Sequence, residues 1–272
     1  IKYLMMTTWR FIDSGLCSAS YNMALDEVLA ISVREGKSVP ALRIYGWGNP
    51  SVSIGYFQKI KDIDFEYCAG KGIPVVRRPT GGRALLHDEE ITYSFSSQTS
   101  DGIFSGGLME SYKKISQAFQ HAFKRAGIMT EIKFLQDKKH LFNQKEKGSP
   151  LCFDSISFAE LSVNNKKIIG SAQKRWRNCM LQQGSIPISI NNKLLQKIFK
   201  LNEIQENIKE FTALKYLLPD IEIENFKEII RSSFEQTFNI KFIDSIPTQE
   251  ELLLVSNIEK SKYLSNDWTF RR

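Results

Sequence analysis

The pattern of apolar and polar side chains predicts alternating helices and strands in the first half of the chain. Apolar residues recur at intervals of three and four over residues 21–35, between the capping candidates Ser18 and Ser20 and Gly36, which predicts an amphipathic helix. The same spacing predicts a helix over residues 108–126, ending at Gly127. Short runs rich in β-branched and aromatic residues predict strands at 41–47, 51–56, 73–78 and 91–97.

The second half begins with strands and continues with helices. Residues 155–163 and 167–173 have strand character and are joined by Asn164 and Asn165, which tolerate the positive φ of a tight turn. In a hairpin with this turn, Lys167 would pair with Ser162 on the neighbouring strand. A strand at 180–189 is expected to pair nearby, and helical spacing follows at 194–199, 208–217, 226–238 and 250–263.

These elements predict the α/β (α+β) class, with mixed, largely antiparallel sheets flanked by helices. We expect a catalytic domain over residues 6–192, beginning at Met6, and a small helical segment over 193–272 that is packed on it or appended to it. The stretch between Lys133 and Pro150 is rich in lysine and is expected to be a solvated loop.

Composition narrows the class of protein. The 272 residues are 42% hydrophobic, which excludes a disordered or collagen-like chain, and a net charge of +7 favours acidic partners. No apolar run reaches the roughly 18 residues that cross a bilayer, so we expect a cytoplasmic protein that does not bind membranes. The four cysteines lack metal-binding spacing, and we expect no metal site.

The densest chemical signal is the sequence RRPTGGRALLHD at residues 77–88. A predicted strand delivers two arginines into a turn with two glycines, where a ligand can approach the backbone and N–H groups can hold an anionic oxygen. An ordinary tight turn with solvated arginines is the alternative. The arginines and the His87–Asp88 pair around the turn favour a binding loop.

A second signal, KKIIGSAQ, lies at residues 166–173. Small residues on a strand leave a slot that can hold an acyl chain, and a lysine at its mouth can attract a carboxylate, phosphate or oxyanion. The same segment also suits a strand packed under a helix, with a solvated lysine.

Cys152 is a third candidate, at the junction between the basic loop and the predicted hairpin. A cysteine attacks as its thiolate, so its pKa, about 8.5 when free, must fall, and an ammonium such as that of Lys167 would lower it. The turn register alone does not bring these two residues together. Cys17, Cys68 and Cys179 fit inert side chains.

At these residues the sequence resembles the lipoate-protein ligase and octanoyltransferase family, which shares a fold with biotin-protein ligases. Residues 77–88 resemble its R-R-x-[ST]-G-G-x-A-x-x-H-D motif, and residues 167–173 resemble its K-[IV]-x-G-[SA]-[AS] motif. The segments NMALD at 22–26 and PSVSIG at 50–55 match as well, so the resemblance spans about residues 9–190.

The CFD sequence at 152–154 is similar to the cysteine site of the branch that transfers octanoate to the glycine-cleavage H protein. That branch commonly has a proline soon after the cysteine, whereas residues 155–157 here are Ser, Ile and Ser. The resemblance implies an octanoyltransferase of lipoate biosynthesis, with octanoyl-acyl carrier protein as donor and H protein or a lipoyl domain as acceptor. It implies catalytic roles for Cys152 and Lys167 and no cofactor. The implied substrate-binding residues are Arg78, Thr80, Gly81, Gly82, Arg83, His87, Gly170, Ser171 and Ala172.

Two alternatives remain open on the sequence. In an ATP-dependent lipoate or octanoate ligase, Lys167 would bind an acyl-adenylate, ATP and Mg²⁺ would be required, and Cys152 would be a bystander. A basic protein that binds nucleic acid without catalysis would show steeply salt-dependent binding. We expect no nucleic-acid partner, because the basic residues are not interleaved with aromatic ones.

Overall fold

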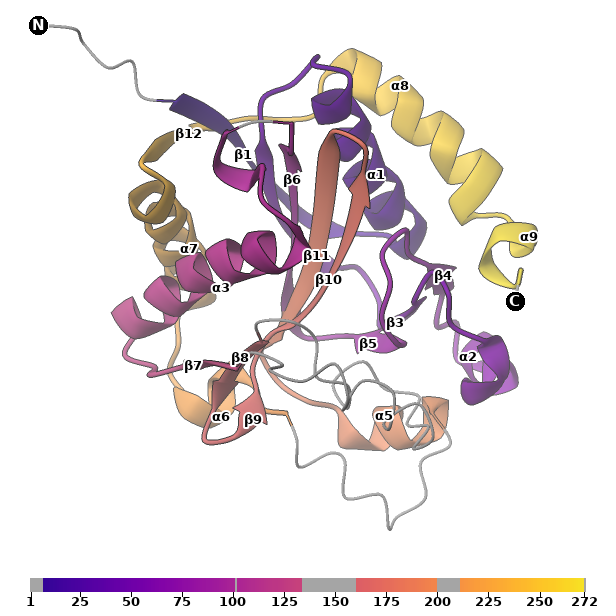
Figure 1. Cartoon of the computed structure of the whole chain (residues 1–272). Coiled ribbons are helices and arrows are strands. Elements are labelled where there is room, and N and C mark those ends of the chain that lie inside the picture. Colours follow the sequence, from indigo (N-terminus) through magenta and orange to yellow (C-terminus); the bar gives the residue numbers. More distant parts are fainter. Residues whose placement is uncertain (1–6, 101, 134–159, 200–210, 272) are drawn as a thin grey trace, which may run out of the picture.

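A six-stranded mixed sheet organises the computed structural model, which describes residues 7–100, 102–133, 160–199 and 211–271. Its strand order is β10-β11-β6-β2-β1-β12 (Figure 1). β1 pairs in parallel with β2 and β12, whereas the neighbours of β6 and β11 run antiparallel. The strands are β1 (Thr7–Cys17), β2 (Ala41–Trp47), β6 (Glu90–Gln98), β10 (Gly170–Trp176), β11 (Cys179–Pro187) and β12 (Ile240–Asp244).

Two three-stranded sheets adjoin the large one. One has the order β4-β3-β5 and consists of β3 (Ser51–Ile54), β4 (Val75–Arg77) and β5 (Leu85–His87). The other has the order β7-β8-β9 and consists of β7 (Glu131–Lys133), β8 (Glu160–Val163) and β9 (Lys166–Lys167).

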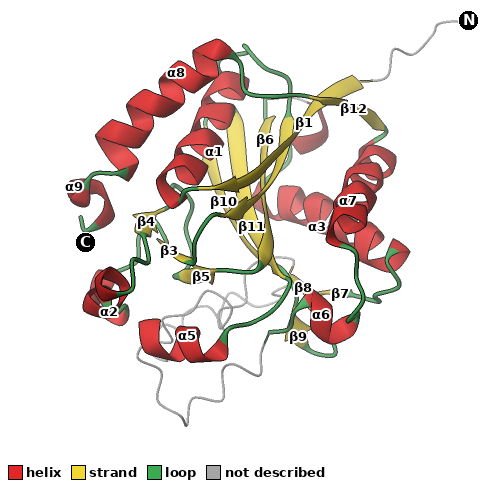
Figure 2. Cartoon of the chain, turned by 180° about the vertical axis from the view of Figure 1, so that it is seen from behind, coloured by secondary structure: helices red, strands yellow, loops and turns green. Residues whose placement is uncertain are grey.

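Helices cover both faces of the large sheet (Figures 1 and 2). On one face α1 (Ala19–Arg34) packs against α8 (Gln249–Ile258), and on the other α3 (Leu108–Arg125) packs against α7 (Ile223–Phe238). No helix among the described residues is both long and apolar enough to cross a membrane. The short helices are Ile60–Asp62, α2 (Phe65–Gly70), Gly102–Phe104, α5 (Asn192–Ile198), α6 (Leu214–Leu217), Glu259–Tyr263 and α9 (Asn266–Thr269).

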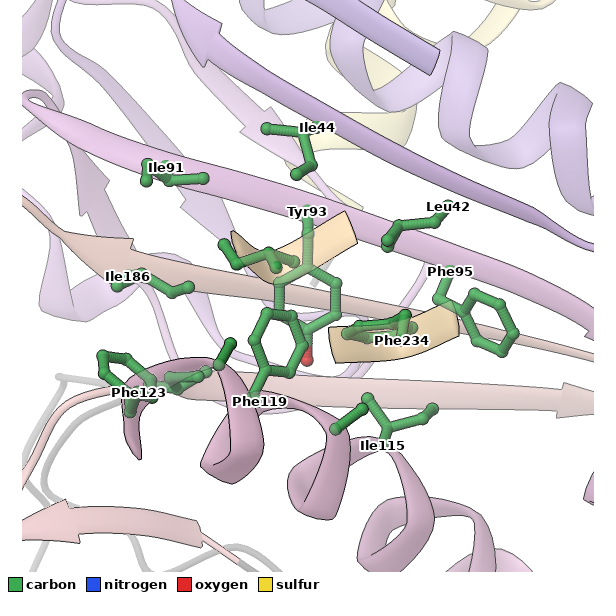
Figure 3. Close-up of a cluster of buried hydrophobic side chains, with 14 of the residues drawn as sticks. Leu42, Ile44, Ile91, Tyr93, Phe95, Ile115, Phe119, Phe123, Ile186 and Phe234 are labelled. Carbon is green, nitrogen blue, oxygen red and sulfur yellow. The ribbon is translucent and has the colours of Figure 1, made fainter. Parts of the chain in front are cut away.

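The main apolar core lies between the large sheet and the α3–α7 pair. The Tyr93 ring on β6 lies 4.5 Å from the Phe119 ring of α3, and Phe119 lies 5.1 Å from Phe234 of α7, between ring centroids (Figure 3). Because side chains alternate along a strand, Thr92 and Ser94 of β6 face the opposite side, toward α1. The α1 face of the sheet therefore carries buried polar groups.

Most of the expected elements are confirmed. The helices predicted at 21–35 and 108–126 correspond to α1 and α3, and the strands predicted at 41–47 and 91–97 to β2 and β6. Asn164 and Asn165 form the turn with φ values of 49° and 63°, and Lys167 pairs with Ser162. The first strand of that hairpin is described only from Glu160 onward.

Other expectations need correction. The strand predicted at 167–173 is divided, because Lys167 ends β9 in a small sheet and Gly170 begins β10 in the large one. The sequence did not predict β1, because a register shift between Asp13 and Leu16 breaks the alternation of buried and exposed side chains along it. Of the helix predicted at 208–217, only 214–217 is helical in the described residues, and Phe211 forms a bridge to Lys167.

The segment 193–272 is not wholly helical, because β12 adds a parallel edge strand to the large sheet beside β1. α7 contributes Phe226, Ile230 and Phe234 to the main core. The division of the chain at residue 192 stays a prediction.

Candidate active site

A pocket lies between the large sheet and the β4-β3-β5 sheet. Its walls combine small residues of two neighbouring strands with apolar and aromatic side chains and a few polar groups. The lining residues are Met23, Tyr45, Trp47, Ser53, Arg78, Leu85, His87, Thr92, Gly170, Ser171, Ala172, Gln183, Gly184 and Ser185. Apart from Gln183, the lining residues of β10 and β11 are small, which leaves room for an elongated, mostly apolar ligand.

A hydrogen-bonded chain of buried polar groups forms one wall of the pocket. His87 Nε2 lies 2.7 Å from Ser53 Oγ, and His87 Nδ1 lies 2.7 Å from Glu90 Oε1. Trp47 stacks on the His87 ring with centroids 3.9 Å apart, and its Nε1 donates to Glu90 and Thr92. These contacts fix the orientation of the imidazole at the wall.

The buried Glu90 carboxyl lies among groups that favour its ionised form. Burial raises the pKa of Glu90. The charge and hydrogen bond of His87, together with hydrogen bonds from Ser185 and Thr92, lower it by more than burial raises it, so the pKa lies below its usual value. The result is a fixed negative charge behind the pocket wall.

Arg78 holds the turn of residues 79–83 to the small sheet. Its guanidinium donates to Ser53 Oγ at 3.0 Å, to the carbonyl oxygen of Gly81 at 2.7 Å and to that of Arg83 at 2.6 Å. Gly55 packs against the turn so closely that a Cβ there would overlap the carbonyl of Gly82. The turn is therefore set by contacts of its carbonyl oxygens with Arg78 and by a glycine opposite it.

Its neighbour Arg77 is tied to the far end of the chain. Arg77 Nε donates to the carbonyl oxygen of Thr269 at 3.0 Å, and Trp268 Nε1 donates to the carbonyl oxygen of Arg77 at 2.7 Å. The last short helix, α9, thus contacts the strand that leads into the turn.

A second buried network centres on Asp26 of α1. Its carboxylate accepts from Arg43 at 2.7 Å, Tyr45 at 2.7 Å, Ser94 at 2.6 Å and Gln183 at 2.7 Å. Asp26 and Arg43 are both fully buried. Gln183 also accepts from Thr80 Oγ1 at 2.8 Å, which connects α1 and the large sheet to the turn.

Lys167 lies at the end of β9 and is buried, with 5% of its side chain exposed. Its Nζ forms an ion pair with Glu160 on the neighbouring strand β8. The backbone N–H of Thr212 donates to the carbonyl oxygen of Lys167 at 2.9 Å. Two residues separate Lys167 from Gly170, the first residue of β10 and a lining residue of the pocket.

Comparison with known proteins identifies the family. The model of the lipoyl protein ligase A/B catalytic domain matches residues 18–235, which include the turn, Lys167 and all of the pocket lining. The chain belongs to this family. The resemblance seen in the motifs is confirmed.

Curated relatives of this family match over nearly the whole chain. The octanoyltransferase LipM of Geobacillus kaustophilus (strain HTA426) is 39% identical over 97% of this chain and 98% of its own. That of Bacillus subtilis (strain 168) is 35% identical over 97% of this chain and 99% of its own.

Solved structures of the family confirm the expected fold class. A crystal structure of lipoate-protein ligase A bound with ATP superposes with a TM-score of 0.81 at 20% identity, covering 97% of this chain and 99% of that one. A bi-partite lipoate protein ligase from Thermoplasma acidophilum gives 0.79 at 20% identity, covering 97% of this chain and 96% of that one.

The structure brings together five of the predicted substrate-binding residues. Arg78 and His87 of the first motif and Gly170, Ser171 and Ala172 of the second all line the pocket, although about eighty residues separate the motifs. Thr80, Gly81, Gly82 and Arg83 are absent from its lining, and the buried Thr80 contacts Gln183 behind the wall. Direct substrate contacts by all nine residues stay a prediction.

Cys152 and most of the lysine-rich stretch lie outside the described residues. The other three cysteines differ from a nucleophile: burial raises the pKa of Cys68 and that of Cys179 to about 11, and it raises that of Cys17 as well. Their thiols therefore stay protonated at neutral pH.

Sequence reasoning missed Glu160, because nothing in its local sequence marks it, and it did not single out Ser53 within the matching segment at 50–55. Glu90 carries a weak signal, since it follows His87 by three residues and directly precedes the strand predicted at 91–97. Over the residues that the structure describes, no group of three or more His, Cys, Asp or Glu side chains is arranged to hold a metal ion.

Proposed function

We propose that this protein is an octanoyltransferase of lipoate biosynthesis, which moves an octanoyl group from octanoyl-acyl carrier protein through a Cys152 thioester to a lysine of a lipoyl-acceptor protein. The observation that carries the proposal is the meeting of both family motifs in the wall of one narrow pocket. Relatives that match the full chain bear the name octanoyltransferase. We further propose that the reaction takes place in the cytoplasm, with these two proteins as its substrates.

The pocket suits the eight-carbon chain. Gly170 and Ala172 leave space above the sheet, and Met23, Trp47 and Leu85 supply apolar surface. Each methylene group removed from water contributes about 0.8 kcal/mol, so the tail anchors the donor and makes chain length matter.

In the first step, the Cys152 thiolate attacks the carbonyl carbon of the donor thioester. A new C–S bond forms to Cys152, the C–S bond to the carrier arm breaks, and the carrier leaves as its thiolate, so the exchange of one thioester for another is nearly balanced in energy. The Lys167 ammonium favours the Cys152 thiolate and stabilises the tetrahedral oxyanion.

Glu160 gives this lysine a defined position. Cys152 precedes Glu160 by eight residues in the sequence, and Glu160 begins the strand that pairs with β9. In the absence of substrate the Glu160 carboxylate balances the buried charge of Lys167. The same ammonium then serves the thiolate and the oxyanion.

In the second step, the neutral ε-amine of an acceptor lysine attacks the octanoyl-Cys152 thioester. A C–N bond forms, the C–S bond to Cys152 breaks, and the proton lost by the amine balances the thiolate that is released. The product is an amide, which is less activated than a thioester, so the transfer proceeds in one direction. H protein or a lipoyl domain is the proposed acceptor.

Intact-mass analysis after mixing with octanoyl-acyl carrier protein tests this proposal. We expect one octanoyl adduct on the wild type, none on Cys152→Ala and much slower formation on Lys167→Ala. Cys17→Ala and Lys166→Ala are the matched controls, because both change a residue of the same type outside the proposed chemistry, and both should form the adduct at the wild-type rate. An adduct that persists in Cys152→Ala contradicts the thioester route.

Two reaction mixtures distinguish the proposed transferase from the ligase alternative. Acceptor protein is supplied with octanoyl-acyl carrier protein alone, or with ATP, Mg²⁺ and free octanoate. The proposal expects acylated acceptor in the first mixture, whereas product only in the second would establish a ligase.

A further inference from the structure

Cations and aromatic rings alternate in a row formed by the end of the chain, the loop after β3 and the edge strand β10. Lys174 Nζ lies 4.9 Å from the centre of the Tyr56 ring, and the Arg271 guanidinium lies 3.9 Å from the same ring. Arg271 also lies 3.9 Å from the Trp268 ring, which Lys262 Nζ approaches at 4.0 Å. We call these five residues the cationic row.

The positive charges of the row are only partly balanced. Lys262 donates to both carboxylate oxygens of Glu27 at 2.7 Å. Neither Lys174 nor Arg271 has a carboxylate within 4 Å among the residues that the structure describes. Two cations of the row are thus left without an acidic partner in this part of the chain.

Arg271 retains donor capacity. Its Nη2 donates to the carbonyl oxygen of Tyr56 at 3.0 Å, while its Nε is buried without a hydrogen-bond partner among the described residues. Burial lowers the pKa of Lys174, and although Glu27 opposes this, the charges of Lys262 and Arg271 lower it further. The environment of these groups is therefore one that an anion would stabilise.

The row borders the pocket. Lys174 follows Ala172 by two residues on β10, so the alternation of the strand puts it on the same face as Gly170 and Ala172. On the other side, the backbone N–H of Tyr56 donates to the carbonyl oxygen of Thr80 in the turn. A ligand that leaves the pocket along β10 meets Lys174 first.

The geometry points to a binding site for a phosphate group of the acyl donor, formed by Lys174 and Arg271 of the cationic row. This inference rests on the proposed function, in which the acyl group arrives on the thiol arm of a carrier protein, and such an arm ends in a phosphodiester. Guanidinium groups bind phosphate with paired N–H donors, and the rings beneath both cations hold them in place before the ligand arrives.

Two small donors that differ only in the phosphate test this site. Octanoyl-4′-phosphopantetheine and octanoyl-pantetheine are compared as substrates for acyl-enzyme formation by wild type, Lys174→Gln and Arg271→Gln. We expect the wild type to prefer the phosphorylated donor in kcat/KM by about tenfold or more, as for charge-assisted hydrogen bonds. Each variant should lose most of that preference through KM while it keeps the wild-type rate with octanoyl-pantetheine.

Lys124→Gln is the matched control, because it removes one positive charge from an exposed position of α3, on the opposite face of the large sheet. It should retain the preference. Unchanged use of octanoyl-pantetheine also shows that the Lys174 and Arg271 variants are folded.

Three outcomes would overturn the inference: no preference in the wild type, equal losses with both donors, or a defect confined to a reaction with ATP and free octanoate. The last would assign the row to a nucleotide phosphate. Failure of the proposed function is a separate result, since it would appear as a missing Cys152 adduct with either donor in the wild type.

Discussion

Replacing Asp26 by asparagine is the most direct test of how the buried network supports the pocket. The substitution keeps the size of the side chain but removes its charge and replaces one acceptor oxygen with an N–H donor group. Asp26 accepts four hydrogen bonds, of which those from Tyr45 and Gln183 reach one oxygen and those from Arg43 and Ser94 the other. An asparagine amide satisfies only one of these two pairs.

The magnitude follows from the burial of both charges. Arg43 is fully buried, and after the substitution its remaining partners are the neutral groups of Asn22 and Ser14. Breaking a buried ion pair by removing one partner costs about 3–5 kcal/mol, because the other charge stays uncompensated. At 2–4 °C for each kcal/mol, the melting temperature should fall by roughly 6–20 °C.

Urea unfolding followed by circular dichroism measures this effect. Asp220→Asn is the control, since the same chemical change at an exposed position should leave stability within about 0.5 kcal/mol. Arg43→Met should be destabilising as well, and the double variant should be more stable than the sum of the single effects predicts, by about 2 kcal/mol or more. A loss below 1 kcal/mol for Asp26→Asn, or strict additivity, would refute the reasoning.

Three further predictions concern the pocket wall, its backing strand and a distant ion pair. Ala172→Leu should narrow the pocket and shift the preference from octanoyl toward shorter donors by about fourfold for each methylene, measured as kcat/KM with a series of acyl chain lengths; an unchanged ratio would contradict the assigned lining. Gly184→Ala should lower the free energy of unfolding by about 1–3 kcal/mol, since its Cβ would overlap the Tyr93 ring, and a wild-type urea midpoint would exclude that overlap. Burial raises the pKa of Glu251, but hydrogen bonds and charge from Arg10 bring it below its usual value. The ionised Glu251 therefore stabilises the fold fully at pH values above the pKa of the carboxyl in the unfolded chain, and this stabilisation is lost as the pH falls through its lower pKa in the folded protein. The stability gap between wild type and Glu251→Gln should therefore shrink from pH 6 to pH 3, and a constant gap would argue against this ion pair.

The candidate site shows where sequence reasoning succeeds. Residues 77–88 and 166–173 combine glycines, arginines and a lysine in short stretches, and such local patterns mark a ligand-binding backbone directly. The partners of these residues come from elsewhere in the chain. Glu160 reaches Lys167 through hairpin register, and Gln183 reaches Thr80 from a neighbouring strand, so tertiary structure alone reveals them.

The fold shows a similar limit. Strong helical periodicity predicted the end of α3 to within one residue. β1 was not predicted because a bulge interrupts it, and β12 was not predicted because it has only five residues. The division of residues 167–173 between two sheets could not be seen in the sequence either, since both halves have strand character. Local pattern predicts the type of an element better than it predicts the sheet that the element joins.

The two hydrogen bonds between Arg77 and α9 have a consequence for synthesis of the protein. Both signature segments have left the ribosome long before Trp268 and Thr269, yet these late residues hold the backbone and side chain of Arg77. A nascent chain that ends before these residues would contain both motifs and still lack the hydrogen bonds that they form with Arg77, next to the binding turn. We therefore expect a chain that ends before Trp268 to form the proposed acyl-enzyme more slowly than the full chain.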